Sequence, residues 1–261
     1  MSFAVVGHVE WISFINVTEL PQAGQILPAQ DFWEEVGGGG SVAAAQLAKL
    51  AGTAHFFTAL GDDEVGRLCL RRLQQLGVHV HVAWRPEPQR RAVVFLDGAG
   101  ERTITVIGPR LEPSEADDLP WHLLDQCRGC YYTGGPTRQA RRARRLVATT
   151  RVRERFIDCQ PDLWVGSAVD PRESTGVEHL RPLLLTDGSQ GGRYWTSFAE
   201  GSWAAEPLPG TPKDAYGCGD SFAAGLAFGL EQGLETAIKM AARCGAACRC
   251  GRGPYEGQLS L

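Results

Sequence analysis

The chain has 261 residues, of which 43% are hydrophobic, and it carries a formal net charge of −4. This length and apolar content are enough for one large α/β domain or two small ones with a substantial core. The acidic balance argues against a general binder of nucleic acid or of anionic membranes. No apolar run approaches the ~20 residues that span a bilayer, so neither kind of partner is expected.

Cysteine usage points to a reducing compartment. Eight cysteines in 261 residues are too few for a disulfide scaffold, and they lack the two short pairs of a zinc ribbon. Cys244 and Cys248 stand four residues apart in an Ala-rich segment, where they are expected to pack as small buried hydrophobes. The N-terminus has no basic segment before its apolar part, so it predicts a first strand rather than a signal peptide. We therefore expect a cytoplasmic protein.

The first part of the chain alternates strand and helix patterns. Residues 3–7 form an apolar run that ends in a glycine, as a buried strand does, and residues 54–61 have the same character. Two helices are predicted. One covers 37–52, where a glycine turn opens an Ala-rich run, and the other covers 63–77, where helical spacing of apolar residues stops at Gly77.

Two segments interrupt this pattern with extra β structure. Residues 9–36 alternate apolar and polar side chains around turn signals, and residues 78–108 do so around a glycine-rich turn. The pattern predicts a single domain over residues 1–261, built as a doubly wound α/β core with these two β insertions.

The second part of the chain continues the alternation. Strands are predicted over 129–135, 155–159 and 181–188, and the last ~45 residues predict two helices. A helix is predicted over 137–151. Eight arginines lie between residues 138 and 155, and a solvated helix face is favoured over a basic binding patch.

A glycine turn leads directly into an acid in the stretch "DAYGCGDSFAAGLAFGL", residues 214–230. The turn at Gly217, Cys218 and Gly219 would leave backbone N–H groups unpaired at a helix N-terminus, where they and the helix dipole favour an anion such as a phosphoryl group. Asp220 would stand beside them, placed to take a proton from a hydroxyl that attacks phosphorus. Taken alone, the pattern fits a capped helix equally well.

Several linked motifs resemble those of the ribokinase-like carbohydrate kinases, the PfkB family. Residues 214–225 resemble the C-terminal signature D-T-x-G-A-G-D-x-F-x-A-G, and 37–52 with "GDDEVG" at 61–66 resemble the N-terminal one. "LTDGSQGG" resembles the nucleotide loop T-x-G-x-x-G, and "LDGAGERTITV" is also similar to a family segment. The motifs occur in the family order from about residue 3 to 257.

The resemblance implies a fold and an activity. The fold is a Rossmann-like doubly wound sheet flanked by helices, with a small β lid from 9–36 and 78–108 that closes over a sugar. The activity is transfer of the γ-phosphoryl group of ATP, with Mg²⁺, to a hydroxyl of a sugar or sugar-like molecule. Lids in this family often pair, so a homodimer through the lid is expected, which would also cover strand edges.

The resemblance also implies residue roles. Asp220 would be the base, and the backbone of Gly217, Cys218 and Gly219 would hold the charge of the transferring group. Asp214 and the Tyr216 carbonyl match positions that hold a monovalent cation, such as K⁺, in some members. The residues expected at ATP are Ser167, Thr186, Gly188 and Gly191. The residues expected at the substrate are Glu10, Gly38, Gly39 and Asp220.

Two departures from the family pattern bear on the substrate and the metal. In the first-strand motif G-S-x-N-x-D, Glu10 takes the Asn place and Ile12 the Asp place, and Val42 replaces a second polar residue. The pocket is therefore expected to reject ribose and to hold one diol at Glu10. The magnesium-linked N-x-x-E motif is absent, and Ser167 and Asp170 are its weak stand-ins.

Three functions remain open on the sequence. The first is a kinase for a sugar or sugar-like alcohol. The second is a nucleoside kinase on the same fold, with Ile12, Val42 and Trp11 accepting a base. The third is a sugar- or nucleotide-binding regulatory protein with weak catalysis. Asp220 and its glycines argue against the third, because binding alone does not need a base.

Overall fold

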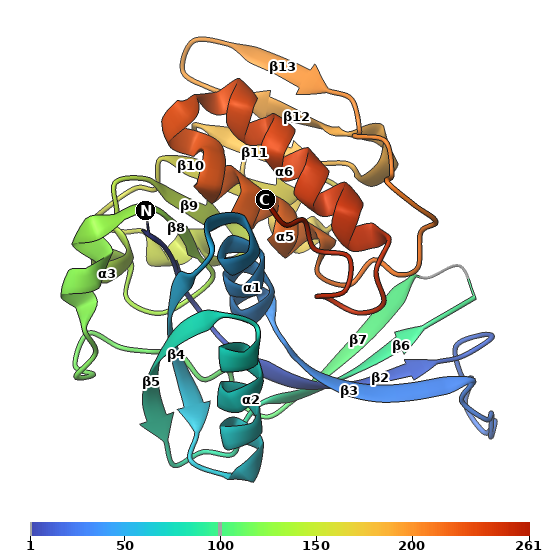
Figure 1. Cartoon of the computed structure of the whole chain (residues 1–261). Helices are drawn as coiled ribbons and strands as arrows, with labels where there is room; N and C mark the ends of the chain where they lie inside the picture. Colours follow the sequence, from blue (N-terminus) through green and yellow to red (C-terminus); the bar gives the residue numbers. More distant parts are fainter. Residues whose placement is uncertain (1, 99–100) are drawn as a thin grey trace.

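The computed structural model describes residues 2–98 and 101–261. A nine-stranded sheet forms the body of the molecule, and a four-stranded sheet extends from one side of it (Figure 1). Among the described residues, no helix is long and apolar enough to cross a membrane. The sequence-based expectation of an α/β sheet flanked by helices, with a small β lid, is confirmed.

The large sheet has the strand order β13-β12-β11-β10-β9-β8-β1-β4-β5. Strands β11 to β5 in this order are parallel to their neighbours, and β12 and β13 are antiparallel. The chain winds in one direction from β1 to β4 and β5, and in the other from β8 onward. The crevice at such a reversal is where doubly wound sheets bind ligands. The strands are β1 Ser2–Val6, β4 Ala54–Gly61, β5 Val78–Arg85, β8 Cys127–Tyr132, β9 Leu146–Thr149, β10 Leu163–Ser167, β11 Leu183–Thr186, β12 Gly192–Trp195 and β13 Glu200–Trp203.

Helical segments cover both faces of this sheet (Figure 1). Strand β1 shows why: Phe3 and Val5 face one buried cluster, whereas Ala4 and Val6 face the other, as period-two alternation requires. The α-helices are α1 Gly39–Ala51, α2 Glu64–Gln75, α3 Thr137–Ala140, α4 Pro171–Ser174, α5 Cys218–Gly229 and α6 Leu234–Arg249. The 3₁₀ helices are η1 Trp121–Gln126, η2 Thr150–Arg155, η3 Gly188–Gln190 and η4 Leu230–Gln232.

The lid is a four-stranded sheet with the order β3-β2-β6-β7. Its strands are β2 Glu10–Asn16, β3 Asp31–Gly37, β6 Arg91–Leu96 and β7 Arg102–Ile107. The second insertion was expected over 78–108, but Val78–Arg85 forms the edge strand β5 of the large sheet, parallel to β4. The alternating pattern of 78–85 predicts a strand and cannot say which sheet the strand joins. Gly98 in the turn is described, but positions 99 and 100, in the expected glycine-rich turn, lie outside the described residues.

The arginine-rich segment departs most from the sequence-based expectation. The helix predicted over 137–151 ends at Ala140, and Leu146–Thr149 forms β9 between β8 and β10. The strand predicted over 155–159 is absent there, since β9 occupies that place in the order. All four residues of β9 are buried, so burial between two strands outweighs the helical spacing of the alanines.

Candidate active site

The N-terminus of α5 presents open backbone donors. Gly217 has φ of 82°, a left-handed turn that favours glycine, and no side chain caps the helix. The Cys218 N–H reaches Ala215 O at 3.5 Å, and the Ser221 N–H donates to Gly217 O at 2.9 Å. Between them, the N–H groups of Gly219 and Asp220 have no backbone partner in the described chain. This is the arrangement that the glycine turn predicts for an anion site.

Asp220 lies at this helix end, in contact with two other elements. The Tyr131 hydroxyl, at the end of β8, donates to Asp220 Oδ1 at 3.4 Å. Gly39, which begins α1, faces the same carboxylate: a Cβ on Gly39 would lie 2.6 Å from Asp220 Oδ1. Burial, and secondly the charge of Glu173, raise the pKa of Asp220 to about 6. The carboxylate is thus ionised at pH 7 yet basic enough to accept a proton.

Glu173 is a candidate site residue that the sequence analysis missed. Its carboxylate accepts a hydrogen bond from the Ser167 N–H at 2.7 Å and pairs with Arg151, which also pairs with Asp170. Glu173 is the acid whose charge acts most on Asp220. The sequence signal was available, because Glu173 stands three residues after Asp170, beyond the end of β10. Arg151 had no such signal, since the arginine run was assigned to a solvated helix face.

Asp170, the predicted metal stand-in, caps α4. Its Oδ1 accepts from the Arg172 N–H at 2.9 Å, and its other oxygen pairs with Arg151. Mg²⁺ favours oxygen ligands and keeps several waters, so one or two carboxylates suffice to hold it. Asp220 stands in the first turn of α5, beside the open N–H groups, and the charge of Glu173 acts on it. Glu173 and Asp220 are therefore the carboxylates that would hold a magnesium ion, and Glu173, rather than Asp170, is the acid whose charge acts most on the expected base.

The predicted nucleotide loop follows β11, next to the Ser167 end of β10. Ser167 and Thr186 are register partners, and Thr186 Oγ1 donates to Gly166 O at 3.3 Å. Gly188 and Gly191 have φ of 51° and 86°, and a Cβ on Gly191 would overlap the backbone of β13 and the residues after it. The structure therefore brings Ser167 and Thr186 together at the carboxyl ends of β10 and β11, with the two glycines in the turn that follows.

Asp214 is bound by backbone donors on both oxygens. It accepts from the Tyr216 N–H at 2.9 Å and from the Gly253 N–H at 2.6 Å, and burial raises its pKa. The Tyr216 carbonyl accepts from the Cys248 thiol at 3.6 Å. Asp214 thus joins the C-terminal loop to the turn before α5. Cation binding at this position stays a prediction.

Cys218, Cys244 and Cys248 are free thiols, and Cys218 is only half-buried. Cys244 and Cys248 are fully buried, as expected. Cys248 and burial raise the pKa of the Cys218 thiol well above its usual range. The described residues hold no group of three or more His, Cys, Asp or Glu side chains arranged to bind a metal.

Glu10 begins the lid strand β2 at the base of the crevice. Its Oε1 accepts from Arg90 Nε at 2.7 Å, and His8 Nε2 lies 3.8 Å from the same oxygen. Gly38, with φ of 84°, packs on it, since a Cβ there would lie 3.1 Å from the Glu10 nitrogen. Of the two consecutive glycines 38 and 39, Gly38 therefore packs against Glu10 and Gly39 against Asp220. The structure places both predicted ends of the substrate site on one short stretch of backbone.

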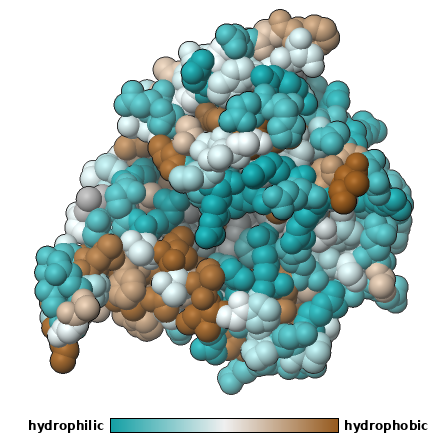
Figure 2. Space-filling model, turned by 180° about the vertical axis from the view of Figure 1, so that it is seen from behind, coloured by the Kyte–Doolittle hydropathy of each residue, from teal (hydrophilic) through white to brown (hydrophobic). Residues whose placement is uncertain are grey.

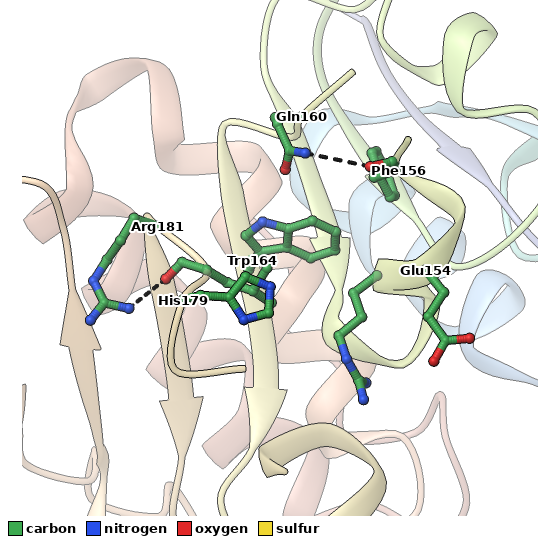
Figure 3. A pocket seen from close by; sticks show the side chains of 8 residues that line it. Glu154, Phe156, Gln160, Trp164, His179 and Arg181 are labelled. Carbon is green, nitrogen blue, oxygen red and sulfur yellow. Dashed lines mark hydrogen bonds between the residues drawn. The ribbon is translucent and has the colours of Figure 1, made fainter. Parts of the chain in front are cut away.

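A separate cavity of about 460 Å³ lies at the other end of β10 (Figure 3). It surrounds Trp164, the second residue of that strand, and His179 and Arg181 line it. The Gln160 amide donates to Phe156 O at 3.4 Å across its rim. None of the predicted site residues lines it.

Comparison with known proteins gives a family and a fold. The chain matches the pfkB family of carbohydrate kinases over residues 2–153 and 169–260. Curated relatives include a ribokinase of Arabidopsis thaliana, 32% identical over 108 residues, and one of Dictyostelium discoideum, 27% identical over 109 residues. These alignments cover 40% and 41% of this chain, and the chain spans 28% and 34% of the relatives' lengths.

Solved structures resemble the whole chain at low identity. A ribokinase from Thermotoga maritima has a TM-score of 0.75 at 17% identity, with 99% of this chain and 96% of that one covered. Arabidopsis thaliana ribokinase complexed with ribose and ATP gives 0.74 at 19%, covering 98% and 95%. Burkholderia thailandensis nucleoside kinase with inosine gives 0.75 at 17%, covering 100% and 95%. At such identities, the likeness shows the ribokinase-like fold.

Proposed function

We propose that this chain, which belongs to the pfkB family of carbohydrate kinases, transfers the γ-phosphoryl group of ATP to a hydroxyl of a sugar or sugar-like small molecule. The observation that carries the proposal is Asp220, a carboxylate with a pKa raised to about 6 beside the open N–H groups of a helix N-terminus. A base and an anion site at one point are what phosphoryl transfer to an alcohol requires.

The step balances within these residues. The Asp220 carboxylate takes the proton of the substrate hydroxyl as its oxygen attacks the γ-phosphorus. The bond from phosphorus to the bridging oxygen of ATP breaks, and ADP leaves with that bond's electron pair. The N–H groups of Gly219 and Asp220 stabilise the charge on the transferring oxygens, and preorganised donors of this kind supply a large share of catalysis.

ATP is proposed to lie along the carboxyl ends of β10 and β11. Ser167, Thr186, Gly188 and Gly191 would meet its phosphates, since the turn after β11 follows the register partners Ser167 and Thr186. Magnesium, when bound, neutralises phosphate charge. Glu173, with Asp170 behind Arg151, would hold it through oxygen atoms and waters. K⁺ is proposed to lie at Asp214, whose two oxygens also accept backbone N–H groups.

The substrate end favours a sugar over a nucleoside. Ile12 and Val42, two of the three residues expected to accept a base, are fully buried in the core. Ribokinase and a nucleoside kinase share this fold, so both substrate classes belong in the experiment. Glu10, whose Oε1 accepts from Arg90 Nε at 2.7 Å, is proposed to accept hydrogen bonds from substrate hydroxyls as well, since a carboxylate has two acceptor oxygens.

We also propose a homodimer formed through the lid, in the cytoplasm. Every residue of β7 is exposed, and Ile104, Val106 and Ile107 keep 43%, 48% and 53% of their surface open. Figure 2 shows hydrophobic residues gathered over the lid, at lower left. Sedimentation of wild type and Ile107→Glu should show a dimer and a monomer, and a wild-type monomer would contradict the dimer. All eight cysteines are free thiols, which fits a reducing compartment.

The test is ATP consumption over a panel of sugars, sugar acids, sugar phosphates and nucleosides, with Mg²⁺ and with or without K⁺. A kinase should turn over at least one class, and Asp220→Asn should lose most of that turnover. Asp118→Asn, at an exposed acid that is none of the proposed site residues, is the matched control. A thermal shift with ATP and a ligand but no turnover would contradict the enzyme and support the binding protein instead.

A further inference from the structure

An arginine cluster lies at the crevice, at the carboxyl ends of β1 and β8. Its members are Arg90, Arg110 and Arg155, together with Glu10 and Glu112. Arg90 pairs with Glu10 at 2.7 Å, Arg110 Nε lies 2.7 Å from Glu112 Oε1, and Arg155 pairs with the other oxygen of Glu112. Three guanidinium groups thus share two carboxylates. One positive charge is left over.

The cluster is joined to the substrate end through Arg110. Arg110 donates to the Thr133 carbonyl just after β8, and the Thr133 hydroxyl lies 3.5 Å from His8 Nδ1. His8 contacts Glu10, from which glycines 38 and 39 lead to Asp220. A molecule with one hydroxyl at Asp220 could therefore extend its other end to these arginines. Figure 2 shows hydrophilic residues around a hollow in the centre of the molecule, beside the lid.

Two polar atoms of the cluster lack hydrogen-bond partners among the described residues. Arg110 Nε and Glu112 Oε1 are close but not aligned for a hydrogen bond, and both are buried without one among the described residues. Burial lowers the pKa of Arg110, the charge of Glu112 opposes this shift, and the charges of Arg155 and Arg90 add to it. The His8 pKa is well below its usual range, first through burial and then through Arg110, Arg90 and Arg155. His8 is therefore neutral at pH 7. It neither adds to nor offsets the positive charge of the arginines.

We propose that the substrate is an anionic polyol, with a carboxylate or a phosphate monoester bound by Arg90, Arg110 and Arg155 while its hydroxyl reaches Asp220. This rests on the proposed function for the position of the reacting hydroxyl. An added anion supplies the missing acceptor for Arg110 and balances the surplus charge. Arginine is suited to both anions, since its planar fork of donors matches the oxygens of each.

Matched pairs of substrates test the proposal. Glucitol and gluconate differ by a carboxylate, and glucose and glucose 6-phosphate by a phosphate, so the two arms separate the two anions. We expect kcat/KM for one anionic member to exceed that of its neutral counterpart by about 10²-fold or more. Arg110→Gln should remove most of that preference by raising KM, and change the neutral counterpart less than about threefold. Arg138→Gln, at an exposed pair with Asp158, is the matched control.

Binding measured without turnover separates this proposal from the kinase proposal. In calorimetry with Asp220→Asn, an anionic polyol should bind and its neutral counterpart should bind at least about tenfold more weakly. If Arg110→Gln abolishes anion binding but the wild type turns over none of the substrates, the anion site is supported and the kinase is contradicted. Turnover of neutral polyols as efficient as that of their anions would keep the kinase and overturn the anion site. Equal losses for charged and neutral substrates in Arg110→Gln, or no anion binding at millimolar concentration, would also overturn it.

Discussion

The two ends of the crevice are built in opposite ways. The proposed phosphoryl end is one contiguous turn, with Gly217, Gly219 and Asp220 at the start of α5. The substrate end joins side chains from separate segments, with Glu10 from β2, Arg110 from the connection after β7, and Arg155 from η2. Backbone geometry at a helix end is local, so a short motif specifies it. A side-chain cluster is assembled by the fold and leaves no motif.

The largest expected effect is loss of turnover in Asp220→Asn. Removing the base should lower kcat by about 10²–10⁴-fold, while the Kd for ATP stays near the wild-type value because the loop after β11 is untouched. Steady-state kinetics and calorimetry measure the two constants. A well-folded variant with wild-type turnover would show that the contiguous end does not carry the chemistry.

The same substitution should raise stability at alkaline pH. The folded-state pKa of Asp220 is raised to about 6, so its favourable contribution is fully present below the unfolded pKa of about 4 and is lost as pH rises through 6. The ionised group then costs up to about 3 kcal/mol, which the amide removes. Urea unfolding should show Asp220→Asn more stable than wild type at pH 8, and the gain should vanish near pH 4. An equal difference at both pH values would contradict the raised pKa.

Gly39→Ala should cost about 10² in kcat/KM. Its Cβ would lie 2.6 Å from Asp220 Oδ1, and displacement of a reacting group by about 1 Å is enough for such a loss. Gly245→Ala is the matched control, because its Cβ would have no neighbour closer than 3.5 Å. The control should keep its activity and gain up to about 1 kcal/mol of helix stability. Wild-type kinetics in Gly39→Ala would mean that the two ends are not coupled through this glycine.

A smaller effect is expected for Glu173→Gln. Glu173 raises the pKa of Asp220, so its removal should lower that pKa. The acid limb of the kcat/KM profile, expected near pH 6 in wild type, should then move to lower pH. The Mg²⁺ concentration for half-maximal activity should rise in the same variant. An unchanged limb and an unchanged Mg²⁺ titration together would exclude Glu173 from the site.

The smallest effect is expected for Asp170→Ala. Asp170 caps α4 and pairs with Arg151, so we expect it to act on a magnesium ion only through waters. We expect a higher Mg²⁺ requirement without loss of kcat. Comparing Mg²⁺ titrations of this variant and Glu173→Gln ranks the two acids, and a larger shift in Asp170→Ala would reverse the order that the structure gives.

The lid and the arginine segment mark where prediction from the sequence failed. Residues 78–85 were recognised as a strand but assigned to the lid, because alternation does not identify a strand's partner. Residues 146–149 were assigned to a helix, because the spacing of Ala140 and Ala143 is that of a helix. In the structure, residues 146–149 form the buried strand β9. In both cases, the deciding quantity was burial against segments far away in the chain.

The sequence by itself determined the α/β class, the glycine turn before α5 and the place of Asp220 at its start, because each depends on local spacing and on backbone freedom. Only the tertiary structure decided that Gly39 faces Asp220, that Glu173 rather than Asp170 acts most on its charge, and that Arg90, Arg110 and Arg155 share two carboxylates. These are interactions between residues distant in sequence. Their energies depend on distance and desolvation, which no spacing along the chain encodes.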